Sequence, residues 1–168
     1  MGYTPSTETS NANKSKMREI FNKLVPNGDD YKIAYGFDTD VTMGDFLVVR
    51  STTYTYSSFI IGYSEAKEEI VVILTEPDLS EYGKPVYIKK SEIIKATYSS
   101  IVAQYNIRDD KLPKRYIQFC IPGMTDDPKL YVDILQEQEM NDFKGFFQKV
   151  FASESNCPFC KVFKKIFG

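Results

Sequence analysis

The sequence predicts a mainly β protein with a helix near each end of the chain. Its middle consists of short runs rich in Val, Ile, Tyr, Phe and Thr, separated by clusters of Gly, Pro, Asp and Ser, which is the pattern of consecutive β-strands. Apolar residues recur at helical spacing before and after this region. The length of 168 residues is that of one domain with a single sizeable core.

The N-terminal region, residues 1–28, divides into a leader and a short helix. Residues 3–16 are rich in Ser, Thr and Asn and lack apolar periodicity, so we expect a loose leader there. A stripe at helical spacing predicts an amphipathic helix over residues 13–24, which ends before the breaker sequence Pro26-Asn27-Gly28. The stripe consists of Met17, Ile20, Phe21 and Leu24.

The β region begins at Tyr31, and its adjacent runs are expected to merge into about seven strands. In the last well-patterned run, Ile117, Phe119 and Ile121 alternate with more polar residues. This alternation predicts an antiparallel sheet with these three side chains toward the core and its other face in water. The candidate strands are Tyr31–Phe37, Phe46–Arg50, Tyr54–Tyr63, Glu69–Thr75, Pro85–Lys89, Ile93–Tyr98, Ile101–Ile107, Lys114–Ile121 and Lys129–Leu135.

After Leu135 the spacing of the apolar residues changes back to that of a helix. Residues 138–152 carry a stripe at helical spacing, and we expect this helix to cover the open end of a bent, partly closed barrel. Each large apolar side chain contributes about 1.5–3 kcal/mol when fully buried, so this helix stabilises much of the domain predicted for residues 29–152. The stripe consists of Met140, Phe143, Phe147, Val150 and Phe151.

Segments of the β region and of its closing helix resemble a known family. Val86-Tyr87-Ile88-Lys89-Lys90-Ser91-Glu92-Ile93-Ile94-Lys95-Ala96 passes from a strand through a polar pair into an Ile-centred strand. Further strands follow around Tyr116 and Tyr131, and the helix opens with Asn141-Asp142-Phe143-Lys144-Gly145-Phe146-Phe147. Over residues 30–152 the chain resembles the bacterial pleckstrin-homology-like (PH-like) domains. The resemblance implies a bent antiparallel barrel of about seven strands capped by a C-terminal helix, and a binding scaffold without a catalytic centre.

The loop after the first strand departs from the phosphoinositide-binding members of the wider superfamily. Those members place Lys and Arg in and around this loop, whereas this chain has Asp38-Thr39-Asp40-Val41-Thr42-Met43-Gly44-Asp45. Carboxylates in this position repel a phosphate headgroup. No phosphoinositide ligand is therefore expected.

Composition excludes several classes of function. The chain has no histidine, which removes Ser-His and Cys-His nucleophiles and imidazole metal ligands. Its 21 Lys and Arg against 23 Asp and Glu give no general attraction to nucleic acid. We therefore predict a non-enzymatic binding module, with no catalytic, cofactor-binding or metal-binding residues. Its expected partner is another protein, or a second copy bound by pairing of strand edges.

A cytoplasmic location is expected from the same sequence. No apolar run approaches the roughly 20 residues of a membrane-spanning helix. The first residues, Met1 to Ser6, lack the basic region and apolar stretch of a secretory signal.

The motif Cys157-Pro158-Phe159-Cys160 leaves a less favoured alternative open. In redox proteins a C-x-x-C motif at a helix N-terminus has a lowered thiol pKa. These four residues are similar to a glutaredoxin site, but only eight residues follow them, whereas most of a glutaredoxin fold follows its motif. Two ordinary cysteines in a docked tail are the favoured interpretation over a dithiol redox protein.

The tail, residues 153–168, is predicted to form a short amphipathic helix. Lys161, Lys164 and Lys165 lie off its apolar stripe, and a helix of about 12 residues is not stable alone in water. We expect it to dock on its own domain or on a sister subunit, with peripheral attachment to a membrane as the alternative. The stripe consists of Phe159, Val162, Phe163, Ile166 and Phe167.

Deletion of residues 157–168 tests this docking. If the stripe is buried against protein, the truncated chain should have a lower melting temperature or a different oligomeric state. Thermal unfolding and light scattering measure both. An unchanged melting temperature and size would contradict docking on protein, and loss of salt-sensitive liposome sedimentation with an intact fold would favour the membrane alternative.

Overall fold

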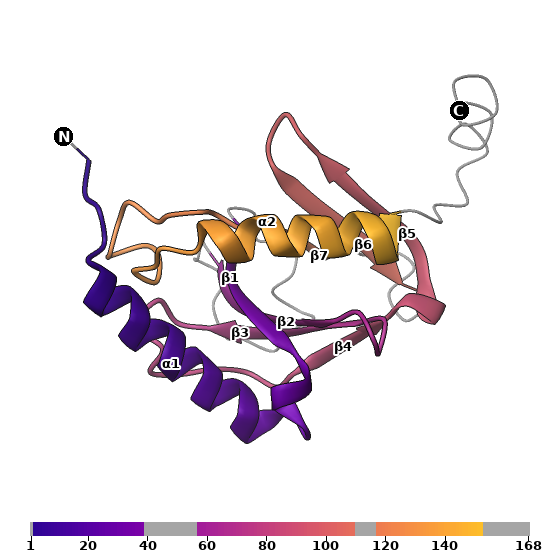
Figure 1. Ribbon diagram of the computed structural model, residues 1–168, viewed down its shortest axis with the longest axis horizontal. Helices are drawn as coiled ribbons and strands as arrows, with labels where there is room; N and C mark the ends of the chain where they lie inside the picture. The colour runs from indigo at the N-terminus through magenta and orange to yellow at the C-terminus, as the bar shows by residue number, and fades with distance from the viewer. Residues whose placement is uncertain (1, 39–56, 110–116, 153–168) are drawn as a thin grey trace.

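Seven strands form a single antiparallel sheet in the computed structural model, which describes residues 2–38, 57–109 and 117–152. The strand order is β4-β3-β2-β1-β7-β6-β5 (Figure 1). The predicted mainly β fold with terminal helices is confirmed. The elements are α1 (Thr7–Leu24), η1 (Gly28–Asp30), β1 (Lys32–Asp38), β2 (Ser57–Ser64), β3 (Glu69–Thr75), β4 (Val86–Lys89), η2 (Lys90–Glu92), β5 (Ile93–Ser99), β6 (Gln104–Asp109), β7 (Ile117–Cys120), α2 (Glu137–Phe146) and the π-helical η3 (Phe147–Ala152).

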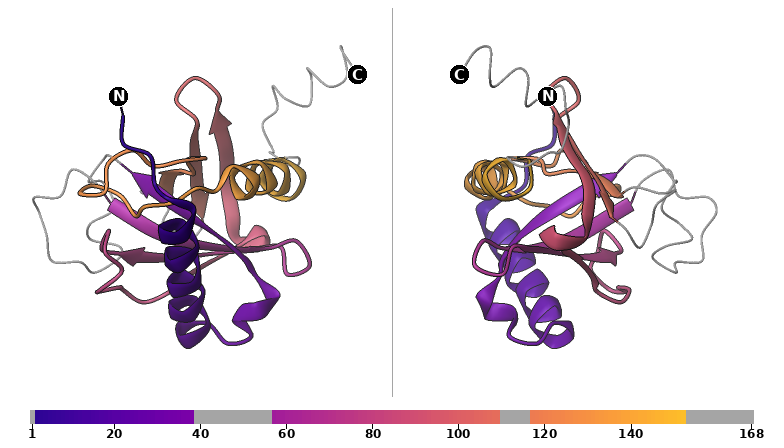
Figure 2. Two further views of the ribbon diagram at one scale, coloured as in Figure 1. Left: turned by 60° about the vertical axis from the view of Figure 1, so that its left-hand side comes forward. Right: turned by 90° about the vertical axis from the view of Figure 1, so that its right-hand side faces the viewer.

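The sheet consists of two meanders joined at a narrow seam. Strands β1 to β4 form the first and β5 to β7 the second, and within the described residues β1 and β7 meet at the pair Phe37 and Cys120. The meanders run in different directions in Figures 1 and 2, so the sheet is strongly bent. The chain turns a corner at η2 between β4 and β5, and these outer strands do not pair in the described part of the chain. The sheet is therefore not closed into a barrel.

The first helix begins at Thr7, so the prediction of a loose leader over residues 3–16 is wrong for residues 7–16. Ser6 caps the helix, because its Oγ accepts a hydrogen bond from the backbone N–H of Thr9 at 3.0 Å. Such a cap satisfies one of the N–H groups left without a partner in the first helical turn. A serine that looks like part of a loose leader therefore starts the helix.

Polar side chains of α1 also bind a segment far away in the sequence. The Oγ of Ser10 accepts a hydrogen bond from the N–H of Leu135 at 2.8 Å. The Nδ2 of Asn13 donates to the backbone carbonyl of Asp133, also at 2.8 Å. Ser and Asn residues in this region thus make tertiary contacts. The local composition does not reveal these contacts.

Two hydrophobic clusters lie on opposite faces of the first meander. One fills the space between the two meanders and α2, and it contains Phe59 and Ile61 of β2. The other lies under α1 and contains Ile60. Phe21 of α1 approaches Gly62 so closely that an added Cβ would lie 2.2 Å from its ring. Strands β2 and β3 are therefore buried on both faces, unlike the expected sheet with one face in water.

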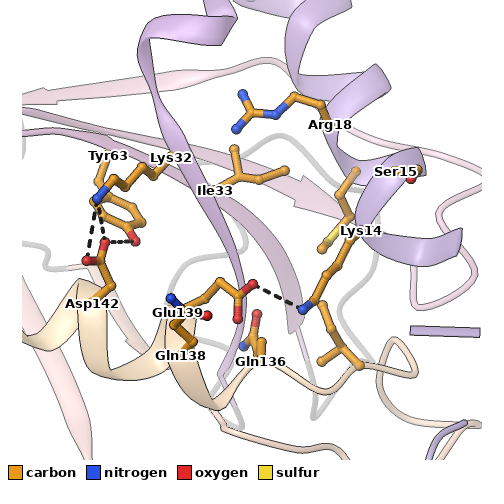
Figure 3. Close-up of a pocket in the computed structure, with 12 residues that line it drawn as sticks. Lys14, Ser15, Arg18, Lys32, Ile33, Tyr63, Gln136, Gln138, Glu139 and Asp142 are labelled. Carbon is orange, nitrogen blue, oxygen red and sulfur yellow. Dashed lines mark hydrogen bonds and ion pairs between the residues drawn. The ribbon is translucent and has the colours of Figure 1, made fainter. Parts of the chain in front are cut away.

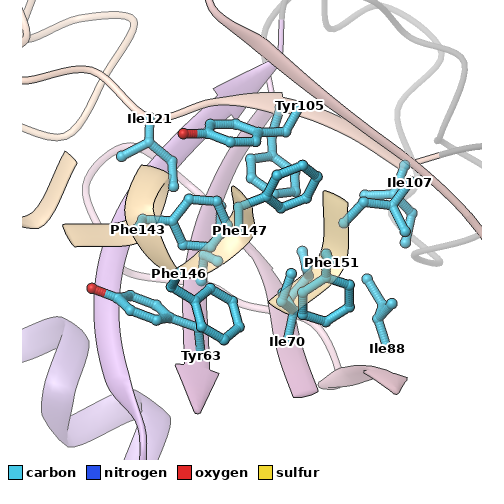
Figure 4. Packing of buried hydrophobic residues seen from close by; sticks show 14 of the residues in the cluster. Tyr63, Ile70, Ile88, Tyr105, Ile107, Ile121, Phe143, Phe146, Phe147 and Phe151 are labelled. Carbon is cyan, nitrogen blue, oxygen red and sulfur yellow. The ribbon is translucent and has the colours of Figure 1, made fainter. Parts of the chain in front are cut away.

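The C-terminal helix runs through α2 into η3 and covers the first cluster (Figure 4). Its predicted stripe is confirmed, and one further side chain, Phe146, is also buried. The ring of Phe146 packs against Tyr63 of β2, with centroids 5.0 Å apart, so the sheet contacts a wider face of the helix than the stripe defines. The buried stripe residues are Phe143, Phe147, Val150 and Phe151, and Met140 packs against them partly buried.

Each observed strand overlaps one of the predicted runs, and within the described residues the largest difference is at the start of β6. The run Ile101–Ile107 is shifted, because β6 begins at Gln104, after a turn that ends with Ala103 in the left-handed region at φ 52°, and ends at Asp109. The run Phe46–Arg50 and Tyr116 lie outside the described residues.

The predicted strand Lys129–Leu135, which includes the strand expected around Tyr131, is not a strand in the structure. Within the described residues, its backbone pairing is confined to an isolated bridge between Met124 and Leu135, with a hydrogen bond from the N–H of Thr125 to the carbonyl of Ile134 at 3.2 Å. The Oγ1 of Thr125 donates to the carbonyl of Val132 at 2.7 Å and accepts from the N–H of Ile134 at 3.0 Å. A side chain thus binds part of the backbone that a regular ladder would pair, and the segment packs under α1 as an irregular chain.

Replacement of Phe147 by Ala should lower the free energy of unfolding by about 3–5 kcal/mol, because it leaves a cavity in the first cluster. The matched control is Ile101→Ala, at a position that is 94% exposed, where a change within about 0.5 kcal/mol is expected. Urea unfolding followed by circular dichroism measures both. A loss below about 1 kcal/mol for Phe147→Ala would show that this ring does not support the core.

Candidate functional site

Strands β5 and β6 form a hairpin that projects beyond the rest of the sheet (Figures 1 and 2). The pairing runs from Lys95 opposite Arg108 to Ser99 opposite Gln104. A turn over residues 100–103 joins the two strands. This turn is the end of the hairpin farthest from the helices.

Apolar side chains occupy the end of this hairpin. Ile101 is 94% exposed and Val102 is 59% exposed, and we call these two residues the hairpin tip. A single exposed apolar residue is ordinary on a protein surface. Two adjacent ones on a projecting hairpin form an apolar patch of the kind that a partner covers.

The hairpin is anchored close to its turn, because Tyr98 and Tyr105 form the second strand pair from the turn. The Sγ of Cys120 also donates to the backbone carbonyl of Val102 at 3.8 Å. The rings of Tyr98 and Tyr105 lie 4.7 Å apart, and Tyr105 stacks on Phe119 at 5.4 Å. Lys144 of α2 lies over the Tyr98 ring, 5.2 Å from its centroid. Burial raises the pKa of Tyr105, so its hydroxyl stays neutral. The exposed tip is therefore held in place by these contacts.

Strand β5 is also an outer strand, with no neighbour on its other side in the described part of the sheet. A bulge between Ile93 and Lys95 interrupts its pairing with β6, and bulges hinder the addition of a further strand. The regular edge is therefore Lys95 to Ser99, next to the hairpin tip. Lys95 and Arg108 face each other across the hairpin and both are exposed, so cations flank this edge.

A cleft of about 520 Å³ lies between α1 and α2, with β1 at its base (Figure 3). A second hollow, of about 440 Å³, shares Lys32, Tyr63 and Asp142 with it. The cleft combines charged side chains on its walls with apolar ones at its base. Its lining includes Lys14, Arg18, Lys32, Ile33, Glu139 and Asp142.

Two ion pairs connect the walls of the cleft. The Nζ of Lys14 on α1 lies 3.0 Å from Oε1 of Glu139 on α2. The Nζ of Lys32 on β1 lies 3.2 Å from Oδ2 of Asp142, one helical turn further along α2. Positive and negative side chains therefore alternate across the opening. Such an arrangement can bind charged groups of a ligand.

The carboxylate of Asp142 is held in place from a second side. Tyr63 donates its hydroxyl hydrogen to Oδ2 of Asp142 at 2.7 Å. This hydrogen bond, together with Lys32, holds the pKa of Asp142 below its ordinary value. Burial and the same hydrogen bond raise the pKa of Tyr63. At neutral pH Asp142 is therefore an ionised carboxylate and Tyr63 is a neutral hydrogen-bond donor. The hydrogen bond between them fixes the carboxylate as an acceptor.

The cysteine that the structure describes is not an activated thiol. Burial, and then the nearby Asp38 carboxylate, raise the pKa of Cys120, whereas a reactive cysteine has a lowered thiol pKa. Cys157 and Cys160, together with the rest of the tail over residues 153–168, lie outside the described residues.

The acidic loop after β1 is described only at its first residue. Asp38 is buried at the end of β1, where Nε2 of Gln118 donates to its Oδ1 at 3.3 Å. Residues 39–45 lie outside the described part of the chain. Asp38 thus has a structural contact, and the expectation that this loop does not bind a phosphoinositide stays a prediction.

Comparison with protein-family models, curated proteins and solved structures gives no match to this chain. Among the described residues, no group of three or more His, Cys, Asp or Glu side chains is arranged to hold a metal ion. No helix in that same part of the chain is long and apolar enough to span a membrane. Function must therefore be inferred from the hairpin and the cleft themselves.

Sequence reasoning missed both surfaces. It places Ile101 inside a strand, although the preceding pair Ser99-Ser100 is a turn signal that could have moved the boundary. The cleft has no local signal, because Lys14 and Glu139 are 125 residues apart. Their proximity follows only once α1 and α2 are placed on the sheet.

Replacement of Asp142 by Asn should reduce the acid sensitivity of the fold. Because the folded-state pKa of Asp142 lies below the unfolded value of about 3.9, its ionisation stabilises the folded protein above that pH. This contribution is lost as the pH falls through the folded-state pKa. We therefore expect the free energy of unfolding to fall more steeply below about pH 4 in the wild type than in Asp142→Asn.

Urea unfolding at a series of pH values measures this difference. The control is Glu137→Gln, on the exposed side of the same helix and outside the cleft lining. It should follow the wild-type pH profile. Identical acid dependence of Asp142→Asn and the wild type would contradict the role of this carboxylate.

Proposed function

We propose that this protein is a non-enzymatic, cytoplasmic self-association module, in which the hairpin tip and the adjoining edge of β5 bind a second copy of the chain. The observation that carries the proposal is the hairpin tip, where Ile101 is 94% exposed beside Val102 on a projecting hairpin. Burial of these side chains against a partner removes apolar surface from water. Because Tyr98 and Tyr105 anchor the hairpin close to its turn, this gain requires little ordering of the hairpin on binding.

A second copy fits this surface for two reasons. Most soluble oligomers are symmetric, and a two-fold axis places the same patch of each copy against its twin. An outer strand such as β5 offers backbone groups that the same strand of another copy can pair with. The formal net charge of −2 creates little long-range repulsion between copies.

We also propose that the chain is a PH-like domain. The resemblance of residues 30–152 is supported by the bent sheet of seven antiparallel strands and by a C-terminal helix over its core. The open corner between β4 and β5 departs from the closed barrel that the resemblance implies. In this proposal the sheet is a scaffold, and the projecting hairpin is its binding element.

Peripheral binding to a membrane is the second candidate function. The observation in its favour is the position of Lys95 and Arg108 on the same hairpin as the apolar tip. An apolar tip can enter the lipid interface, and cations attract anionic headgroups by about 1 kcal/mol each. Lys95 and Arg108 pair at the end of the hairpin away from the turn. Two such cations give weak attachment, so this candidate requires the basic tail as well.

The double variant Ile101→Glu/Val102→Glu tests the proposed self-association. Because both side chains are exposed, the monomer should stay folded, whereas two carboxylates at the contact should weaken association by at least tenfold, which is about 1.4 kcal/mol. Sedimentation equilibrium over a wide concentration range measures the association constant.

The matched control is Asn11→Glu/Ala12→Glu, which adds the same charge at exposed positions of α1 and should associate like the wild type. A wild type that stays monomeric at every concentration, or a hairpin variant that associates equally well, would show that the tip does not join two copies. Wild-type sedimentation with anionic liposomes, lost in the hairpin variant, would favour the membrane candidate.

A further inference from the structure

The cleft between α1 and α2 has a charge pattern that restricts the ligands it can accept. Lys14, Arg18 and Lys32 contribute cations to its lining, and Glu139 and Asp142 contribute carboxylates (Figure 3). A purely anionic ligand that bound Lys14 and Lys32 would leave the carboxylates of Glu139 and Asp142, one helical turn apart, without their lysine partners. A purely cationic ligand would leave the lysines unpaired. Either exchange loses as much attraction as it gains.

A ligand with both charges also exchanges two ion pairs for two, but the side chains that it displaces, Glu139 and Lys32, carry opposite charges, so it does not leave two like charges without partners. Its carboxylate can replace Glu139 at Lys14, and its ammonium group can replace Lys32 at Asp142. The displaced side chains lie at the surface, where the side chain of Lys32 is 69% exposed and that of Glu139 is 33% exposed, so water solvates them after the exchange.

One group in the cleft is already positioned for such a ligand. The carboxylate of Asp142 accepts a hydrogen bond from Tyr63 in addition to its contact with Lys32, so the loss of Lys32 leaves it oriented. A fixed group loses little entropy on binding. The guanidinium of Arg18 is engaged elsewhere, by the carbonyls of Gly28 at 2.9 Å and Tyr31 at 2.8 Å and by Oδ1 of Asn22 at 3.5 Å.

We propose that this cleft binds a small zwitterion with an apolar side chain, namely a free amino acid or a dipeptide. The ligand carboxylate lies at Lys14, the ammonium group at Asp142, and the apolar side chain on Ile33. The volume of about 520 Å³ lies within the range of about 300–1,000 Å³ that is usual for small-molecule sites. This inference is independent of self-association through the hairpin.

Isothermal titration calorimetry of the full chain tests the proposal with leucine and leucyl-leucine as probes. N-acetyl-leucine lacks the ammonium group and leucinamide lacks the carboxylate. Each should bind at least about tenfold more weakly than leucine, because each lacks one of the two charged contacts. Comparison of leucine with leucyl-leucine shows whether the site prefers the amino acid or the dipeptide.

Lys14→Gln and Lys16→Gln form a matched pair on α1, because Lys14 lines the cleft and the exposed Lys16 does not. Lys14→Gln should bind leucine about tenfold more weakly than Lys16→Gln, while leucinamide should bind both variants equally. Thermal unfolding without ligand confirms that both are folded. The proposal is overturned if neither zwitterion binds, if the blocked analogues bind as well as leucine, or if the two variants bind leucine equally.

Discussion

The fold depends on one constraint, which is that β2 and β3 are apolar on both faces. Phe59 and Ile61 lie on one side of β2, and Ile60 lies on the other. Each of these side chains contributes about 1.5–3 kcal/mol only when it is covered, so the first meander needs a cover on each face. The second meander with α2 and η3 covers one face, and α1 with the irregular segment after β7 covers the other.

The cleft is a consequence of these two covers. The apolar faces of α1 and α2 point into different clusters, and their polar faces meet at the surface, where Lys14 and Glu139 form an ion pair. This ion pair is partly exposed, and ion pairs near the surface contribute little to stability. Packing of the two apolar faces therefore fixes the distance between the helices, and the charged groups where they meet lie outside both hydrophobic clusters.

The sequence predicts those parts of the fold that rest on local periodicity. The run Glu69–Thr75 coincides with β3, and the stripe over residues 138–152 marks the buried face of α2 and η3. Prediction fails where a side chain binds backbone outside its own run, as Ser10 does to Leu135 and Thr125 does to Ile134. Local periodicity does not reveal such contacts, nor does it reveal the cleft, whose residues Lys14 and Glu139 are far apart in the sequence.

The hairpin and the cleft are positioned by the same aromatic ring. Phe143 of α2 packs against Tyr105 of the hairpin, with centroids 4.9 Å apart, and against Tyr63 of β2 at 5.1 Å. Tyr105 anchors the hairpin close to its turn, and the hydroxyl of Tyr63 orients Asp142 in the cleft. Protein interiors are close-packed and transmit displacements. The positions of the hairpin and of the Asp142 side chain therefore both depend on the position of the Phe143 ring. The exposed side chains at each surface, such as Ile101 and Lys32, contribute little to the core, whereas the rings that hold their strands in place are buried in it.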